Sequence, residues 1–178
     1  MLSLNTRDGD DNVIAVIETS RETRTKLAFD EESEAFVVKK VLPQGMSFPF
    51  DFGFIPSTLG GDGDPLDVLV LMDEALPTGT VVPSRVIGLI EAQQTDEDGK
   101  TTENSRLIGV AAACEIFGDV KKLSDLPQAV VEQIEHFFVT YNQEEGKRFE
   151  VTGRHGRKRA KECVETGMRR YRRKQRTS

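Results

Sequence analysis

Cysteine, histidine and tyrosine are scarce in this chain of 178 residues, each occurring twice, and tryptophan is absent. The two cysteines, Cys114 and Cys163, stand far apart and lack the spacing of metal ligands. We therefore expect neither a disulfide framework nor a zinc site built from cysteines. So few cysteines are also typical of a protein in a reducing cytoplasm.

Long apolar runs are missing as well. No segment approaches the ~18 apolar residues that a membrane-spanning helix needs. The first residues, MLSLNTRDGDDN, carry acids where a secretory signal needs bases followed by an apolar core. With 37% apolar and 30% charged residues, the composition is typical of a globular protein. We expect one cytoplasmic domain over residues 1–178, with no membrane partner.

Charge is unevenly distributed along the chain, whose net charge is −6. Residues 147–178 hold thirteen Lys and Arg against three acids, while the part before them is strongly acidic. The basic C-terminal tail, about 154–178, could bind nucleic acid or could be an amphipathic helix packed on the acidic body. The second alternative is favoured by an apolar stripe at helical spacing, formed by Ala160, Val164, Met168 and Tyr171.

Short segments rich in Val and Ile predict β-strands. They lie at 13–18, 34–42, 66–72, 80–92 and 106–113. The polar turn TDEDGKTTENS separates the last two, so that 85–113 is predicted to form a hairpin. Several short strands joined by turns indicate a small barrel or sandwich.

Helical patterns come late in the chain. The segment SDLP at 124–127 offers Ser or Asp as an N-cap and a proline for the first turn. Apolar residues then recur at helical spacing at Val130, Ile134, Phe137 or Phe138, and Tyr141. Together with the weaker pattern of the tail, this predicts two helices outside the strands.

The segment GGDGDPLDVLVLMD, residues 60–73, places Asp62, Asp64 and Asp67 at the start of an apolar strand. Burying an unpaired carboxylate is costly, so Asp67 needs a partner. One alternative is a DGD turn with Asp67 as a buried ion-pair partner. The other is a metal site, whose oxygen ligands favour Mg²⁺, Mn²⁺ or Ca²⁺ over Zn²⁺. The residues alone indicate a candidate metal-dependent phosphate enzyme.

The stretch FPFDFGFIPSTLGGDGDPLDVLVL resembles the signature region of the family I soluble inorganic pyrophosphatases. The resemblance continues through VIGLIEA, DLPQAVVEQIEHFFVTY and EGKRFEV, and so covers roughly residues 13–153. It implies a mainly β fold, a small closed OB-like barrel of five strands with two C-terminal helices. It also implies hydrolysis of inorganic diphosphate to two phosphates with several Mg²⁺ ions, Mn²⁺ being an alternative ion. Members of the family are usually homo-oligomers, often hexamers.

Residue roles follow from the same resemblance. Asp62 and Asp67 resemble ligands of the ions that hold the attacking water, and Asp64 resembles the general base, so Asp64 and Asp67 are the candidate catalytic residues. Further metal ligands are implied at Glu18, at Asn104 and at Asp96, with Asp98 as the alternative to Asp96. The implied substrate-binding residues are Lys26, Lys40, Arg106 and Tyr141.

Several positions depart from the family pattern. They are Ala28, Lys40, Phe52, Asn104, Arg106 and Asn142. Each removes a charge or a hydroxyl or replaces one charged group with another, and losing one charged contact costs about 1.5–3 kcal/mol. Two alternatives therefore stand beside a diphosphatase. One is a hydrolase of another phosphoanhydride or phosphoester, and the other is an OB-like nucleic-acid-binding module with a relict site.

Overall fold

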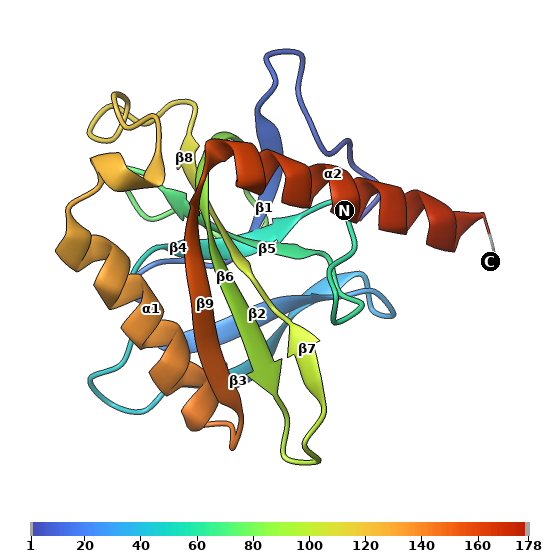
Figure 1. Cartoon of the computed structure of the whole chain (residues 1–178), viewed down its shortest axis with the longest axis vertical. Helices are drawn as coiled ribbons and strands as arrows, with labels where there is room; N and C mark the ends of the chain where they lie inside the picture. The colour runs from blue at the N-terminus through green and yellow to red at the C-terminus, as the bar shows by residue number, and fades with distance from the viewer. Residues whose placement is uncertain (1, 177–178) are drawn as a thin grey trace.

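The computed structural model describes residues 2–176 and is mainly β, with two helices in the C-terminal part of the chain (Figure 1). The strands are β1 Val13–Thr19, β2 Thr25–Asp30, β3 Ala35–Val41, β4 Asp51–Ile55, β5 Leu66–Leu71, β6 Val81–Thr95, β7 Thr101–Glu103, β8 Arg106–Ala111 and β9 Arg148–Gly156. A 3-10 turn, η1, spans Leu123–Asp125, and the helices are α1 Gln128–Gln143 and α2 Arg157–Gln175. No helix within the described residues is both long and apolar enough to span a membrane.

Five strands close into a ring in the order β1-β4-β5-β8-β6, because β6 also pairs with β1. All contacts around the ring are antiparallel except that between β5 and β8, which is parallel. β9 pairs with the long strand β6, and β2 and β3 form a separate hairpin. The predicted fold class, a five-stranded closed β-structure with two C-terminal helices, is confirmed.

Strand β4 was missed by hydrophobic periodicity, although all five of its residues are buried. Its central residue is Gly53, and a Cβ atom there would lie 1.9 Å from the carbonyl oxygen of Val16. Only glycine allows β1 and β4 to approach so closely. A glycine in the middle of a short apolar segment is an ordinary sign of a loop, and so the sequence pattern concealed the strand.

The first helix, α1, begins at Gln128, two or three residues later than the predicted Asp or Ser cap implies. Ser124 and Asp125 do not cap it; they belong to η1, where the Asp125 carboxylate accepts the N–H groups of Lys121 and Lys122. Pro127 occupies the N-cap position without a side-chain hydrogen bond. The predicted apolar face is confirmed at Ile134 and the two phenylalanines that follow it, but Val131 is buried in place of Val130, and Tyr141 is only half-buried.

The second helix, α2, begins at Arg157, because residues up to Gly156 belong to β9. Its packing face buries Ala160, Val164 and Gly167, while Tyr171, the expected end of the stripe, is only half-buried. The Gly167 carbonyl accepts the N–H of Leu59, which lies just before the aspartate turn. Helix α2 therefore anchors the segment that leads into β5, crossing one end of the sheet (Figure 1).

Acidic residues of the body partner several bases of the C-terminal segment, as the amphipathic-helix alternative predicts. The ion pairs are Arg154–Glu135, Arg159–Glu91, Lys161–Asp11 and, at 4.0 Å, Arg170–Glu103. The uneven charge of the sequence is thus partly neutralised within one fold.

Candidate active site

Asp67 has a cationic partner in the neighbouring strand. The parallel pairing of β5 with β8 sets Val68 opposite Leu107, which brings Asp67 beside Arg106. Arg106 Nη1 lies 2.5 Å from Asp67 Oδ2, and the arginine is 4% exposed. The ion-pair alternative for Asp67 therefore describes part of its environment.

The aspartate turn is held by its own hydrogen bonds. Gly60 N–H donates to the Asp64 carbonyl at 2.7 Å, and Asp64 N–H donates to Asp62 Oδ1 at 3.1 Å. Gly63 has a φ of +97°, which favours glycine. The turn leaves Asp64 exposed at the start of β5.

Asp62 is exposed as a whole residue, yet its carboxylate is partly desolvated in the turn. This desolvation raises the pKa of Asp62, and the negative charges of Asp67 and Asp64 raise it further. Three carboxylates thus repel one another at one end of β5. Added cations would relieve this repulsion.

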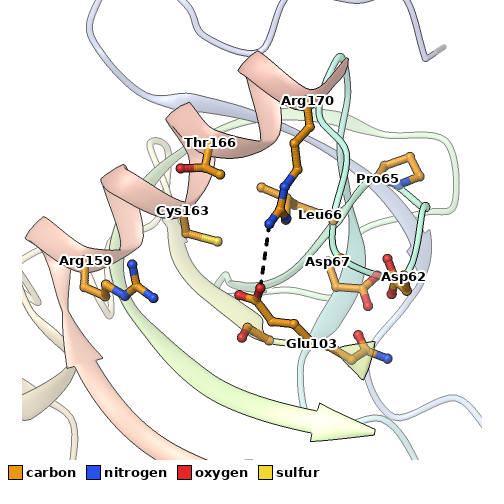
Figure 2. A pocket seen from close by; sticks show the side chains of 13 residues that line it. Asp62, Pro65, Leu66, Asp67, Glu103, Arg159, Cys163, Thr166 and Arg170 are labelled. Atoms are coloured by element: carbon orange, nitrogen blue, oxygen red, sulfur yellow. Dashed lines mark ion pairs between the residues drawn. The ribbon is translucent and has the colours of Figure 1, made fainter. Parts of the chain in front are cut away.

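Three pockets meet at Asp67, which lines all of them. The helix pocket, about 160 Å³, lies between the aspartate turn and α2 (Figure 2). The hairpin pocket, about 330 Å³, adds Glu18, Lys26 and Asp64 beside the β2–β3 hairpin. The aromatic pocket, about 160 Å³, is lined by Lys26, Arg106, Tyr141 and several phenylalanines.

In the hairpin pocket, Glu18 and Lys26 form a buried pair. Glu18 accepts the N–H of Phe29 at 2.8 Å and the Lys26 ammonium at 3.4 Å. Burial raises the pKa of Glu18 and lowers that of Lys26. The ammonium also lies 4.2 Å from the ring centroid of Phe52, so it bridges the hairpin and aromatic pockets.

At the mouth of the aromatic pocket, Lys40 lies 3.5 Å above the Tyr141 ring and 2.6 Å from Glu145 Oε1. Burial raises the pKa of Tyr141 well above its ordinary range, so its hydroxyl keeps its proton and can donate to an anion. Lys147 joins Glu145 at 3.7 Å and Asp96 at 4.0 Å.

The β6–β7 hairpin connects Asp96 to the same region through amides. Gln94 Nε2 donates to Asp96 Oδ1 at 2.8 Å, and Asn104 Nδ2 donates to Gln94 Oε1 at 2.9 Å. Asn104 Oδ1 accepts from Arg106 Nη1, so the oxygen predicted as a metal ligand faces a guanidinium. Asp98 instead accepts the N–H of Lys100 in the exposed turn, away from this network.

Most of the predicted site residues therefore gather around Asp67. Those lining one of the three pockets are Glu18, Lys26, Asp62, Asp64, Asn104, Arg106 and Tyr141. Lys40 and Asp96 reach the pockets through Glu145 and Gln94, which sequence reasoning missed. The sequence did not indicate these connecting roles, because Gln94 is a neutral residue in a hairpin and Glu145 is an ordinary polar residue just after a helix.

Helix α2 also contributes a wall of the site that the sequence did not indicate. Figure 2 shows Arg159, Cys163, Thr166 and Arg170 on its face toward Glu103 and the aspartates. Burial raises the pKa of the Cys163 thiol to about 11, so the thiol lines the pocket in its neutral form. The signal was the spacing of these residues by three and four along a helix.

Comparison with known proteins shows which family has this arrangement of residues. The inorganic pyrophosphatase family model matches residues 15–172. The inorganic pyrophosphatase of Thermus thermophilus is 41% identical over 159 residues, covering 88% of each chain, and that of Helicobacter pylori strain J99 is 35% identical over 162 residues, covering 90% of this chain and 92% of the relative. This chain belongs to the inorganic pyrophosphatase family.

Solved structures of inorganic pyrophosphatases show the same fold. The Thermus thermophilus enzyme superposes with a TM-score of 0.85 at 39% identity, covering 96% of this chain and 97% of that one. The Helicobacter pylori enzyme gives 0.84 at 31% identity, covering 96% and 99%.

Within this inorganic pyrophosphatase fold, the departures from the family pattern line the pockets, except for Lys40 at the mouth of the aromatic pocket. Phe52 lines the aromatic pocket below the Lys26 ammonium. Asn142 is buried there and donates to the Phe138 carbonyl at 2.8 Å. Ala28 lines the hairpin pocket, where a small side chain leaves the space near Glu18 open.

Proposed function

We propose that this chain hydrolyses inorganic diphosphate to two phosphates, with Mg²⁺ as its cofactor and Mn²⁺ as an alternative. The observation that carries the proposal is the position of Asp67, where carboxylates on one side meet buried cations on the other. Membership of the inorganic pyrophosphatase family supports the same reaction.

The donor set suits a hard cation, because the turn and the hairpin pocket offer carboxylates without histidine or cysteine. Within residues 2–176, no three His, Cys, Asp or Glu side chains lie close enough together to hold an ion by themselves. Mg²⁺ does not need such a cage, since it usually takes one or two carboxylates together with waters and substrate oxygens. Asp62, Asp67, Glu18 and Asp96 are the residues that would hold the ions. When bound, the ions neutralise diphosphate and lower the pKa of a water.

The chain's own residues then do the remaining work. Asp64, exposed at the turn, accepts a proton from the attacking water at its carboxylate. The water oxygen bonds to one phosphorus, and the bond from that phosphorus to the bridging oxygen breaks with its electron pair leaving on the second phosphate. Lys26, Lys40, Arg106 and Tyr141 hold phosphate oxygens. The Nε of Arg106 is buried and has no hydrogen-bond partner among the described residues, so it is a donor available to an anion.

The proposal extends to location and assembly. We infer a cytoplasmic homo-oligomer, with a hexamer as the form that the family resemblance implies. We also propose that residues 1–178 act as one domain, whose residues Met1, Thr177 and Ser178 lie outside the described part. Analytical ultracentrifugation of the full chain tests the assembly.

The decisive experiment is phosphate release from diphosphate with Mg²⁺, measured for the wild type, for Asp64→Asn and for an EDTA blank. Because Asp64 acts as the base, we expect the variant to lose roughly 10²–10⁴-fold in kcat. Its melting temperature should not change, since the carboxylate is exposed. Full activity of Asp64→Asn would overturn the assigned mechanism, and a preference for another phosphoanhydride in a substrate panel would overturn the choice of diphosphate.

A further inference from the structure

A row of side-chain hydrogen bonds runs from the β6–β7 hairpin to Asp67. Asp96 accepts from Gln94, Gln94 accepts from Asn104, and Asn104 accepts from Arg106. Arg106 in turn contacts Asp67 at 2.5 Å. Two neutral amides therefore connect a carboxylate on the hairpin to the guanidinium at the junction of the pockets.

The ends of this row determine the orientation of its middle. An ionised carboxylate only accepts hydrogen bonds, and a guanidinium only donates them. The two amides between them satisfy both ends only when both point the same way, with the NH₂ groups toward Asp96 and the oxygens toward Arg106. The structure has this orientation, and it uses both ends of Asn104.

The guanidinium depends on this arrangement because few other groups hold it. Arg106 lies among aromatic rings, 4.8 Å from the centroid of Phe138 and 5.4 Å from that of Phe149. Its Nη1 also lies 3.3 Å from the carbonyl oxygen of Asn104 and 3.4 Å from that of Ser105, both at the long end of the hydrogen-bond range. The Asn104 amide and the Asp67 carboxylate are the closer partners.

We propose that Asn104 and Gln94 are positioning residues, forming an oriented amide relay that holds the Arg106 guanidinium on Asp67. Asn104 then acts through Arg106 and not as a metal ligand. The catalytic consequence rests on the proposed function, in which Asp67 and Arg106 take part. The relay itself is a property of the fold and is testable without metal or substrate.

An aspartate at position 104 has nearly the same shape but the wrong polarity. It would turn an oxygen toward Gln94 Oε1, so that two acceptors face each other and the row that holds Arg106 is broken. Gln94 would rotate its amide to donate to the new carboxylate, and its oxygen would then face the carboxylate of Asp96. Replacing Asp96 with asparagine provides a donor to the Gln94 oxygen, so the rotated Gln94 amide has a hydrogen-bond partner at both ends.

The experiment measures the cost of Asn104→Asp in three backgrounds: wild type, Asp96→Asn and Glu97→Gln. Glu97 is the matched control, because it is exposed in the same hairpin and its substitution removes the same charge outside the relay. For each protein, kcat and KM for diphosphate are measured with Mg²⁺, and the melting temperature is measured in EDTA. A merely structural role would lower the melting temperature without changing kcat.

We expect Asn104→Asp to lower kcat about 10–100-fold in the wild-type and Glu97→Gln backgrounds, the cost of one hydrogen bond to a charged group. In the Asp96→Asn background the cost should fall to about threefold or less. The fall in melting temperature should follow the same pattern. An equal cost in all three backgrounds would overturn the relay, and equal relief by Glu97→Gln would reduce it to an effect of net charge.

Failure of the proposed function is distinguishable from failure of the relay. A wild type that releases no phosphate refutes the diphosphatase. The melting temperatures in EDTA then still decide whether Asn104 and Asp96 are coupled through the relay.

Discussion

The charged residues on the two sides of Asp67 differ in whether they have ion-pair partners. On the turn, neither Asp62 nor Asp64 forms an ion pair with any described residue, and both stand exposed. In and beside the aromatic and hairpin pockets, each cation proposed to bind substrate already has a carboxylate: Lys26 has Glu18 at 3.4 Å, Lys40 has Glu145 at 2.6 Å and Arg106 has Asp67 at 2.5 Å.

This difference indicates what each side needs from outside. The turn carries uncompensated negative charge, so under the proposed function added cations would be needed before it could bind a diphosphate anion. The cationic side is already neutral, so a bound phosphate shares its lysines and arginine with the protein's own carboxylates. A count of charges along the chain shows neither fact, because pairing depends on side chains brought together by the fold.

The largest expected effect comes from Asp67, the residue common to both sides. Asp67→Asn should lower kcat/KM by roughly 10²–10⁴-fold. It should also lower the free energy of unfolding by about 1–3 kcal/mol, because the buried Arg106 loses its charged partner. Urea denaturation in EDTA measures the second effect, with Asp64→Asn as the control that keeps full stability. Equal stability of the two variants would abolish the distinction between the two sides.

A moderate effect is expected at the mouth of the aromatic pocket. Lys40→Met should raise KM for diphosphate about tenfold, because a cation above the Tyr141 ring is lost. Glu145→Gln should leave KM unchanged or lower it, since it frees the Lys40 ammonium from its carboxylate. Steady-state kinetics of both variants test the pair. A rise in KM for Glu145→Gln would mean that the carboxylate positions the lysine and does not compete for it.

The smallest effect is expected at Glu91, which lines none of the three pockets and pairs with Arg159 at 2.8 Å and His155 at 3.0 Å. The hydrogen bond from Arg159, followed by that from His155, lowers the pKa of Glu91 below its ordinary 4.5. A lowered pKa means that the stabilisation is present above pH 4.5 and is lost as the pH falls through the folded-state pKa.

Glu91→Gln should therefore lower the free energy of unfolding by at most about 1 kcal/mol at pH 7, which is the usual contribution of a partly exposed ion pair. The difference in the free energy of unfolding between the variant and the wild type should shrink as the pH falls below 4.5. The kcat at pH 7 should not change. Thermal unfolding of both proteins from pH 7 to pH 3 measures this difference in stability. A difference that grows toward low pH would contradict the assignment.

The local sequence determined a good part of this molecule. The alternation of Val, Ile and Leu gave β1, β3, β5, β6 and β8, and the apolar spacing gave both helices. The DGDPLD segment by itself fixed the turn and the place of its carboxylates, because glycine and aspartate set the backbone within a few residues. Family likeness, carried by the same segment, gave the list of candidate residues.

Only the tertiary structure decided how those residues are paired. Asp67 and Arg106 meet because β5 and β8 lie parallel in a fixed register, although they are far apart in sequence. The orientation of the Asn104 amide follows from Gln94 of β6 and Arg106 of β8, and Gly167 of α2 packs closely against Leu66, which lines the helix pocket. Such pairings depend on strand register and on close approach between distant segments. A sequence determines them only through the whole fold, so no local pattern reveals them.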